Sequence, residues 1–182
     1  MRLRRALVLV LMISIVAASA ADAARRGPKK QEDATPAPPP GDKRDRVISA
    51  AGSPFNNRTY WQAAAQCGGA YFRLYNLYSE AAISAKVIKP DPAAFTKLSK
   101  DADNAGATAT AFFNISEYFL TVDRKLTRED AVMTYDAVSQ SSGDRLKTTD
   151  AAVQATKPCA DLYKICRGAF PQVCSDPSAL TN

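Results

Sequence analysis

The stretch that decides the fold is residues 61 to 85, which read WQAAAQCGGAYFRLYNLYSEAAISA. Apolar and small residues recur here at steps of three and four, the spacing of one buried face on an α-helix. They are Trp61, Ala64, Gly68, Tyr71, Tyr75, Tyr78, Ala82 and Ala85. The stretch therefore predicts a long helix whose one apolar face packs against a neighbour.

A second helix with the same stepping follows a turn that contains two prolines. Pro90 and Pro92 lie in the segment Lys89-Pro90-Asp91-Pro92, and proline cannot continue a helix but suits the first turn of the next one. The buried face of this second helix is Phe95, Leu98, Ala102, Ala105, Ala109, Phe112, Ser116 and Phe119. We expect the two helices to form an antiparallel hairpin.

The position of the turn sets the register of this hairpin, because facing residues lie at equal distances from it. In that register large side chains oppose small ones, as dense packing requires. The expected pairs are Gly68 with Phe112, Tyr71 with Ala109, Tyr75 with Ala105, and Tyr78 with Ala102.

A third long helix is expected to begin after Thr127. The Thr127 hydroxyl can cap the helix, and Glu129 and Asp130 suit its positively charged first turn. Glycine at position 143 weakens a helix by about 1 kcal/mol relative to alanine and could break it. Matching the length of the first two helices favours a continuous third one, so a break at Gly143 stays an open alternative. Its apolar stripe is Ala131, Tyr135, Val138, Ser142, Leu146, Thr149 and Val153.

A short fourth helix is expected at residues 159 to 170, between Pro158 and Pro171. The sequence contains no convincing β-strand signal. The predicted fold class is therefore all-α: an up-and-down helical bundle of three long helices plus a short C-terminal helix, linked by disulfides.

Three regions are expected along the chain. Residues 1 to 23 have the charged start, the apolar run and the small-residue cleavage patterns of a signal peptide. Residues 24 to 53 contain a basic cluster and four closely spaced prolines, so we expect a disordered linker. Residues 54 to 182 form the helical domain. The chain would thus be exported to the periplasm or outside the cell; the alternative is a membrane anchor formed by an uncleaved N-terminal segment.

The positive charge belongs mainly to the N-terminal part of the chain. The whole chain has 24 basic and 18 acidic residues, whereas residues 47 to 182 hold 14 basic and 13 acidic ones. A specific nucleic-acid surface needs clustered positive charge on the fold, so none is expected. The basic linker is expected to contact anionic lipid or another polyanion, or to be only a solubilising tail.

Four cysteines in an exported chain, Cys67, Cys159, Cys166 and Cys174, predict two disulfides. Cys159 and Cys166 are too far apart along one helix to join each other. This favours Cys67–Cys159 with Cys166–Cys174, or Cys67–Cys166 with Cys159–Cys174. A descending fourth helix would instead bring Cys174 to the level of Cys67, so the connectivity stays open.

The tyrosines of the first helix are the candidate ligand site. Facing helices in bundles form ligand pockets, and tyrosine offers an apolar ring with a polar end. The candidate groove consists of Trp61, Tyr71, Tyr75, Tyr78, Ala105 and Ala109. The alternative is that the tyrosines fill this space themselves as part of the core.

No catalytic residue, metal site or cofactor is expected. The chain has no histidine, it has no C-x-x-C pair, and no two acids stand out as buried and paired. We therefore expect an exported non-enzymatic envelope protein that acts by binding, tethering or scaffolding. The alternative is a carrier of an aromatic or apolar small molecule in the groove between the first two helices.

Overall fold

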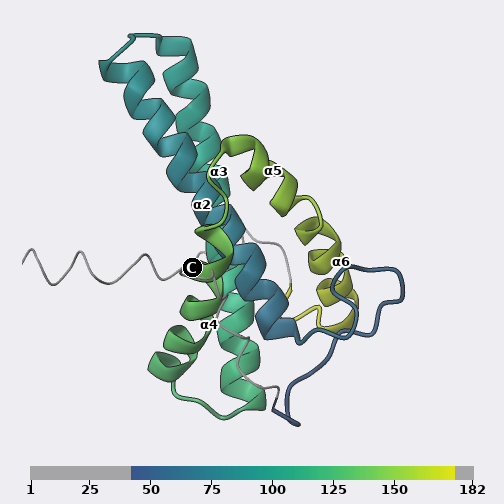
Figure 1. The fold of residues 1–182 in the computed structure, drawn as a ribbon. Helices are drawn as coiled ribbons and strands as arrows, with labels where there is room; N and C mark the ends of the chain where they lie inside the picture. The colour runs from purple at the N-terminus through teal and green to yellow at the C-terminus, as the bar shows by residue number, and fades with distance from the viewer. Residues whose placement is uncertain (1–41, 175–182) are drawn as a thin grey trace, which may run out of the picture. The chain divides into compact units, whose positions relative to one another are not determined.

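The computed structural model describes residues 42 to 174, so the expected signal peptide and residues 24 to 41 of the expected linker lie outside the described part of the chain. The described chain forms an up-and-down bundle (Figure 1) in which two disulfides link the elements, which confirms the predicted all-α fold class. Its helices are α2 (Tyr60–Val87), α3 (Pro92–Asp123), α4 (Arg128–Gly143), α5 (Thr149–Thr156) and α6 (Cys159–Ala169).

The two longest helices, α2 and α3, form the predicted antiparallel hairpin (Figure 1). Asp91 caps α3 by accepting a hydrogen bond of 2.9 Å from the amide of Ala94, and Pro92 occupies the first helical position. Nearer the base, the hydroxyl of Ser116 donates to the carbonyl oxygen of Trp61 over 2.9 Å. The hairpin therefore turns where the two prolines predict.

The detailed register differs from the expected one by about one residue. Gly68 faces the ring of Phe113, not Phe112, and a Cβ atom at Gly68 would clash with that ring. Phe112 stacks instead on Tyr71, with ring centroids 5.9 Å apart. The physical reason is α4, because Tyr135 of α4 stacks on Phe113 at 5.4 Å and draws this side of α3 toward a third helix.

The third helix is not continuous, so the expected passage through Gly143 is wrong. α4 ends at Gly143, and α5 begins at Thr149 after a five-residue connection. Gly143 lies against α2, since a Cβ atom there would be 3.0 Å from the carbonyl oxygen of Gly69. Arg73 of α2 also donates from Nε to the carbonyl oxygen of Leu146 over 2.9 Å, which holds the connection in place.

Residues 42 to 53 belong to the folded domain, which corrects the expected linker boundary at residue 53. Ile48 is fully buried and exchanges backbone hydrogen bonds of 2.8 and 2.9 Å with Arg58 and Asn57. Val47 forms an isolated antiparallel bridge with Thr59. The charged residues 42 to 46 suggest a linker, but the buried Ile48 and the ion pairs of Asp45 with Arg124 and of Arg46 with Asp123 fasten this segment to the helices.

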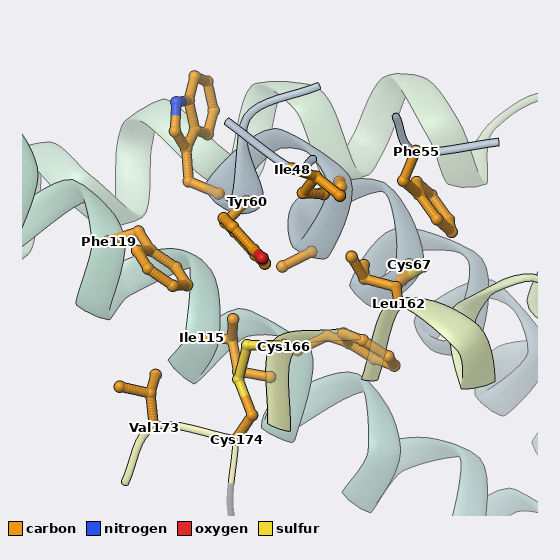
Figure 2. Close-up of a cluster of buried hydrophobic side chains, with 14 of the residues drawn as sticks. Ile48, Phe55, Tyr60, Cys67, Ile115, Phe119, Leu162, Cys166, Val173 and Cys174 are labelled. Atoms are coloured by element: carbon orange, nitrogen blue, oxygen red, sulfur yellow. A yellow bond between two sulfur atoms is a disulfide. The ribbon is translucent and has the colours of Figure 1, made fainter. Parts of the chain in front are cut away.

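The main core lies at the base of the hairpin, where four parts of the chain meet. Figure 2 shows Ile48 from the N-terminal segment, Tyr60 from α2, Phe119 from α3 and Leu162 from α6 around a common interior. Each of these side chains is at most 6% exposed. The base is thus a densely packed unit from which the α2–α3 hairpin extends.

The disulfides join Cys67 to Cys159 and Cys166 to Cys174, with Cα atoms 5.7 and 5.8 Å apart. This is the first of the alternatives left open by the sequence. The Cys67–Cys159 bond ties α2 to α6 across 92 residues, and the Cys166–Cys174 bond fastens the segment after α6 (Figure 2). None of the described helices is long and apolar enough to cross a membrane.

Candidate functional site

The expected groove residues do not form a single site. Tyr71, Tyr75 and Tyr78 pack around a small cluster that contains Ala105. Trp61 lies in the main core instead and is 1% exposed. The structure therefore brings three tyrosines together and separates the tryptophan from them.

An open pocket of about 270 Å³ lies where α6 meets the α2–α3 hairpin. Tyr71 is the one residue of the expected groove in its wall, whereas Ala109 is buried beneath the helix surface. The remaining wall is mostly apolar and comes from α3 and α6: Thr108, Ala111, Phe112, Cys159, Ala160, Tyr163 and Lys164.

Sequence reasoning missed the contribution of α6 to this pocket. The Cys67–Cys159 disulfide fixes the start of α6 against α2, and this places Tyr163 beside the hairpin. Burial raises the pKa of Tyr71, while a hydrogen bond with Thr156 partly opposes the change. The Tyr71 phenol therefore stays neutral, and its hydroxyl is already hydrogen-bonded to Thr156, which lies outside the pocket wall.

A larger hollow of about 400 Å³ lies on the other side of the same disulfide. Arg58 and Arg145 are the charged residues in its wall. Arg58 donates to the side-chain oxygen of Gln66 over 2.6 Å, and Arg145 donates to the hydroxyl of Ser141 over 3.3 Å. Both guanidinium groups are thus held by neutral partners.

The most buried ionic group is a cluster that the sequence did not reveal. Asp45 accepts two hydrogen bonds of 2.7 Å from Arg124 and one of 3.2 Å from the indole nitrogen of Trp61. The guanidinium of Arg124 also lies 4.8 Å from the centre of the Trp61 ring. Burial would raise the pKa of Asp45, but the hydrogen bonds from Arg124 and Trp61 outweigh it and lower the pKa.

This cluster holds the fold together and leaves no reactive group. Both oxygens of Asp45 are occupied, and its side chain is 1% exposed. The carboxylate connects the N-terminal segment to the end of α3, near which Arg46 also pairs with Asp123 at 3.0 Å. Among the described residues, no group of three or more potential metal ligands lies close enough to hold an ion.

The free end of the α2–α3 hairpin is the most distinctive surface. Figure 1 shows the turn between α2 and α3 standing away from α4, α5 and α6. Ile83, Val87 and Ile88 lie at this end and are 62%, 69% and 72% exposed. These side chains fall outside the stepping pattern of the buried face, and this was the signal in the sequence that could have identified them.

Lysines surround this apolar end. The amino group of Lys86 lies 5.3 Å from the centre of the Phe95 ring, and this contact connects α2 to α3 near the turn. Lys97 pairs with Asp101 at 2.5 Å, and Lys89 lies in the turn itself. The end of the hairpin thus combines apolar side chains with positive charge.

Comparisons with known proteins assign no family. No protein-family model matches the chain, and no curated protein or solved structure shows significant similarity to it.

Proposed function

We propose that the chain is an exported, non-enzymatic envelope protein that acts by binding, and that it tethers itself through the free end of its α2–α3 hairpin. The observation that carries this proposal is the cluster of Ile83, Val87 and Ile88, each at least 62% exposed, at the end of a hairpin that extends from a disulfide-linked base. Large apolar side chains that gather on a surface mark interaction sites.

The disulfides support export. Both pairs of cysteines are bonded, and no described cysteine is free. Structural disulfides are typical of proteins that fold in oxidising compartments. Together with the signal-like layout of residues 1 to 23, they favour the periplasm or the cell exterior as the place where the protein works.

The carboxylates of Asp42 and Asp45 serve contacts within the fold, and neither has the state of a general acid. A general acid at neutral pH needs a raised pKa, whereas the pKa values of Asp42 and Asp45 are both lowered. The cause for Asp42 is hydrogen bonding from Arg44; for Asp45, the hydrogen bonds from Arg124 and Trp61 outweigh burial.

Site-specific photo-crosslinking in intact cells tests this proposal. A photoreactive phenylalanine replaces Ile88 in one variant and Met133, which is 66% exposed on α4, in the control. We expect discrete adducts, to a protein or to a lipid, from position 88 and none from position 133. Equal labelling at the two positions, or no adduct at position 88, would contradict the proposal.

A second candidate function, a small-molecule carrier, is favoured by the pocket of about 270 Å³ beside α6. Its apolar wall with the neutral Tyr71 phenol suits a small aromatic or apolar ligand. Native mass spectrometry of two variants tests this function. Ala160→Trp would fill the pocket, whereas the control Ala169→Trp changes a residue of the same helix that lies outside the pocket. If the chain is a carrier, the wild type and Ala169→Trp should carry the additional mass of a bound ligand, and Ala160→Trp should lack it. A wild-type chain without additional mass would exclude this role.

A further inference from the structure

We infer that the free end of the α2–α3 hairpin docks onto an anionic phospholipid surface. This inference rests on the proposed function and names the partner of the same site. The hairpin tip is defined here as residues 83 to 100, which include the end of α2, the turn and the first turns of α3 (Figure 1).

The apolar part of the tip consists of Ile83, Val87 and Ile88. Ile83 and Val87 are four residues apart in α2, so they lie on one side of the helix. Ile88 follows directly as the C-cap residue and is 72% exposed. Burying such side chains in the boundary between headgroups and acyl chains is the main source of affinity for proteins that lie at a membrane surface.

The charge of the tip complements an anionic surface. Residues 83 to 100 contain four lysines and one acid, Asp91, whose carboxylate caps α3. Lys97 pairs with Asp101 just beyond this range, so Lys86, Lys89 and Lys100 carry the positive charge that the tip offers to a partner. By contrast, residues 47 to 182 as a whole hold 14 basic and 13 acidic residues, so the tip is locally basic on a nearly neutral domain. Lysines near a membrane surface attract anionic lipids, and their long side chains reach the phosphates while apolar neighbours enter the lipid.

A second apolar patch on the same domain lacks the positive charge that accompanies the apolar residues of the tip. Val132 and Met133 of α4 are 37% and 66% exposed. Their surroundings, residues 128 to 136, carry three acids and one arginine. An anionic membrane would repel this patch and attract the tip, which makes Met133 a matched control.

The lysines also argue against a second copy of the chain as the partner. Two tips packed face to face would bring Lys86 and Lys89 of one copy near the same residues of the other. Like charges placed opposite one another oppose association. An anionic lipid surface satisfies both the apolar and the charged side chains at once.

Vesicle flotation tests the inference with the full chain as isolated, with both disulfides formed. The probes are vesicles of phosphatidylglycerol mixed with phosphatidylcholine, and vesicles of phosphatidylcholine alone. We expect binding to the mixed vesicles and at least about tenfold weaker binding after Val87→Glu/Ile88→Glu. Met133→Glu should leave the binding unchanged.

Charge reversal provides a second, independent variant. Lys86→Glu/Lys89→Glu should weaken binding to the mixed vesicles by at least about tenfold. The control Lys147→Glu/Lys157→Glu reverses the same charge at exposed positions outside the tip and should bind like the wild type. The four substituted lysines, two in each variant, are all exposed. We therefore expect both variants to fold, and circular dichroism checks this.

Three results would each overturn the inference. The first is equal binding to neutral and mixed vesicles, and the second is unchanged vesicle binding by both tip variants. The third is a chain that does not bind vesicles but forms a dimer in solution, which Val87→Glu dissociates. The photo-crosslinking at position 88 separates this failure from failure of the proposed function. Protein adducts at position 88 without vesicle binding would reject the lipid partner and keep the tethering role. Neither adducts nor vesicle binding would reject both.

Discussion

Asp45 joins three parts of the chain that are distant in sequence. Its carboxylate, 1% exposed, binds Arg124 at the end of α3 and Trp61 at the start of α2. Removing one partner of a buried ion pair costs about 3 to 5 kcal/mol, because the other charge stays buried without compensation. We expect Asp45→Ala to lower the free energy of unfolding in urea by this amount.

The matched control for this variant is Asp103→Ala. Asp103 is exposed on α3, so its removal should change the free energy of unfolding by less than about 0.5 kcal/mol. Equal costs for the two variants would show that the Asp45–Arg124 pair does not stabilise the fold.

The same carboxylate gives a prediction for pH. The pKa of Asp45 in the folded chain lies below its ordinary value of 3.8. A lowered pKa contributes stability that is fully present above the ordinary value and is lost as the pH falls through the folded value. The difference in unfolding free energy between the wild type and Asp45→Ala should therefore shrink below pH 3.8. A difference that stays constant as the pH falls well below 3.8 would contradict this assignment.

At the scale of helices, Gly69 lets α2 and α4 approach closely. A Cβ atom at this position would overlap the backbone carbonyl group of Ser139, which cannot move without shifting α4. We expect Gly69→Ala to lower the free energy of unfolding by about 1 to 3 kcal/mol, although alanine is the better helix former. Thermal unfolding followed by circular dichroism measures the change.

Gly168 is the control, because a Cβ atom added at this position of α6 would meet nothing within 4 Å beyond its chain neighbours and the backbone of its own helix. Gly168→Ala should be neutral or should stabilise the chain by up to about 1 kcal/mol. If Gly69→Ala also stabilised the chain, the close contact between α2 and α4 would be wrong.

The hairpin core gives a further prediction at this scale. Ala105 is 4% exposed and packs beside Leu74 and the tyrosines of α2. Ala105→Leu should overpack this region and cost about 1 to 3 kcal/mol, whereas Ala107→Leu on the exposed side of α3 should cost little. An unchanged melting temperature for Ala105→Leu would refute the register of the hairpin.

Helix starts could be predicted from the sequence more reliably than contacts between helices. Pro92 marks the start of α3, and Thr127 caps α4 by accepting a local hydrogen bond from the amide of Asp130, both of which the sequence indicated. The break at Gly143 lies against the distant Gly69, and the pairing of Gly68 with Phe113 accompanies the stacking of Phe113 on Tyr135 of α4. Gly143 left a local signal that the matching of helix lengths overrode, whereas the exact facing residues depend on tertiary contacts that the sequence pattern does not show.

At the scale of the whole molecule, the two disulfides should contribute unequally. The chain-entropy model assigns about 4 to 5 kcal/mol to a bond that closes a loop of about 90 residues and about 2 to 3 kcal/mol to one that closes a loop of about 10. Removing the Cys67–Cys159 bond, whose cysteines are 92 residues apart, with two alanines should therefore destabilise the chain more than removing the Cys166–Cys174 bond, with its separation of 8. The reverse order in urea denaturation would contradict this ranking.

The candidate site was predictable only in part, because it depends on how the helices are assembled. The sequence indicated Tyr71, but α6 reaches the pocket only because the Cys67–Cys159 bond places it there, and the sequence left this pairing open. Ile83 and Val87 stand out as apolar residues off the buried face. Their exposure follows from the way the hairpin extends beyond α4 and α5, which is a property of the assembled bundle (Figure 1).

The measurement that tests the account of an exported, disulfide-linked bundle most directly is the intact mass of the protein from its native compartment. The mass is compared with and without reduction before thiol alkylation. We expect a chain that starts near residue 21 or 24, with no alkylated cysteine before reduction and all four of its cysteines alkylated after it. Four free thiols before reduction would contradict the oxidised fold and the proposed role in the envelope together.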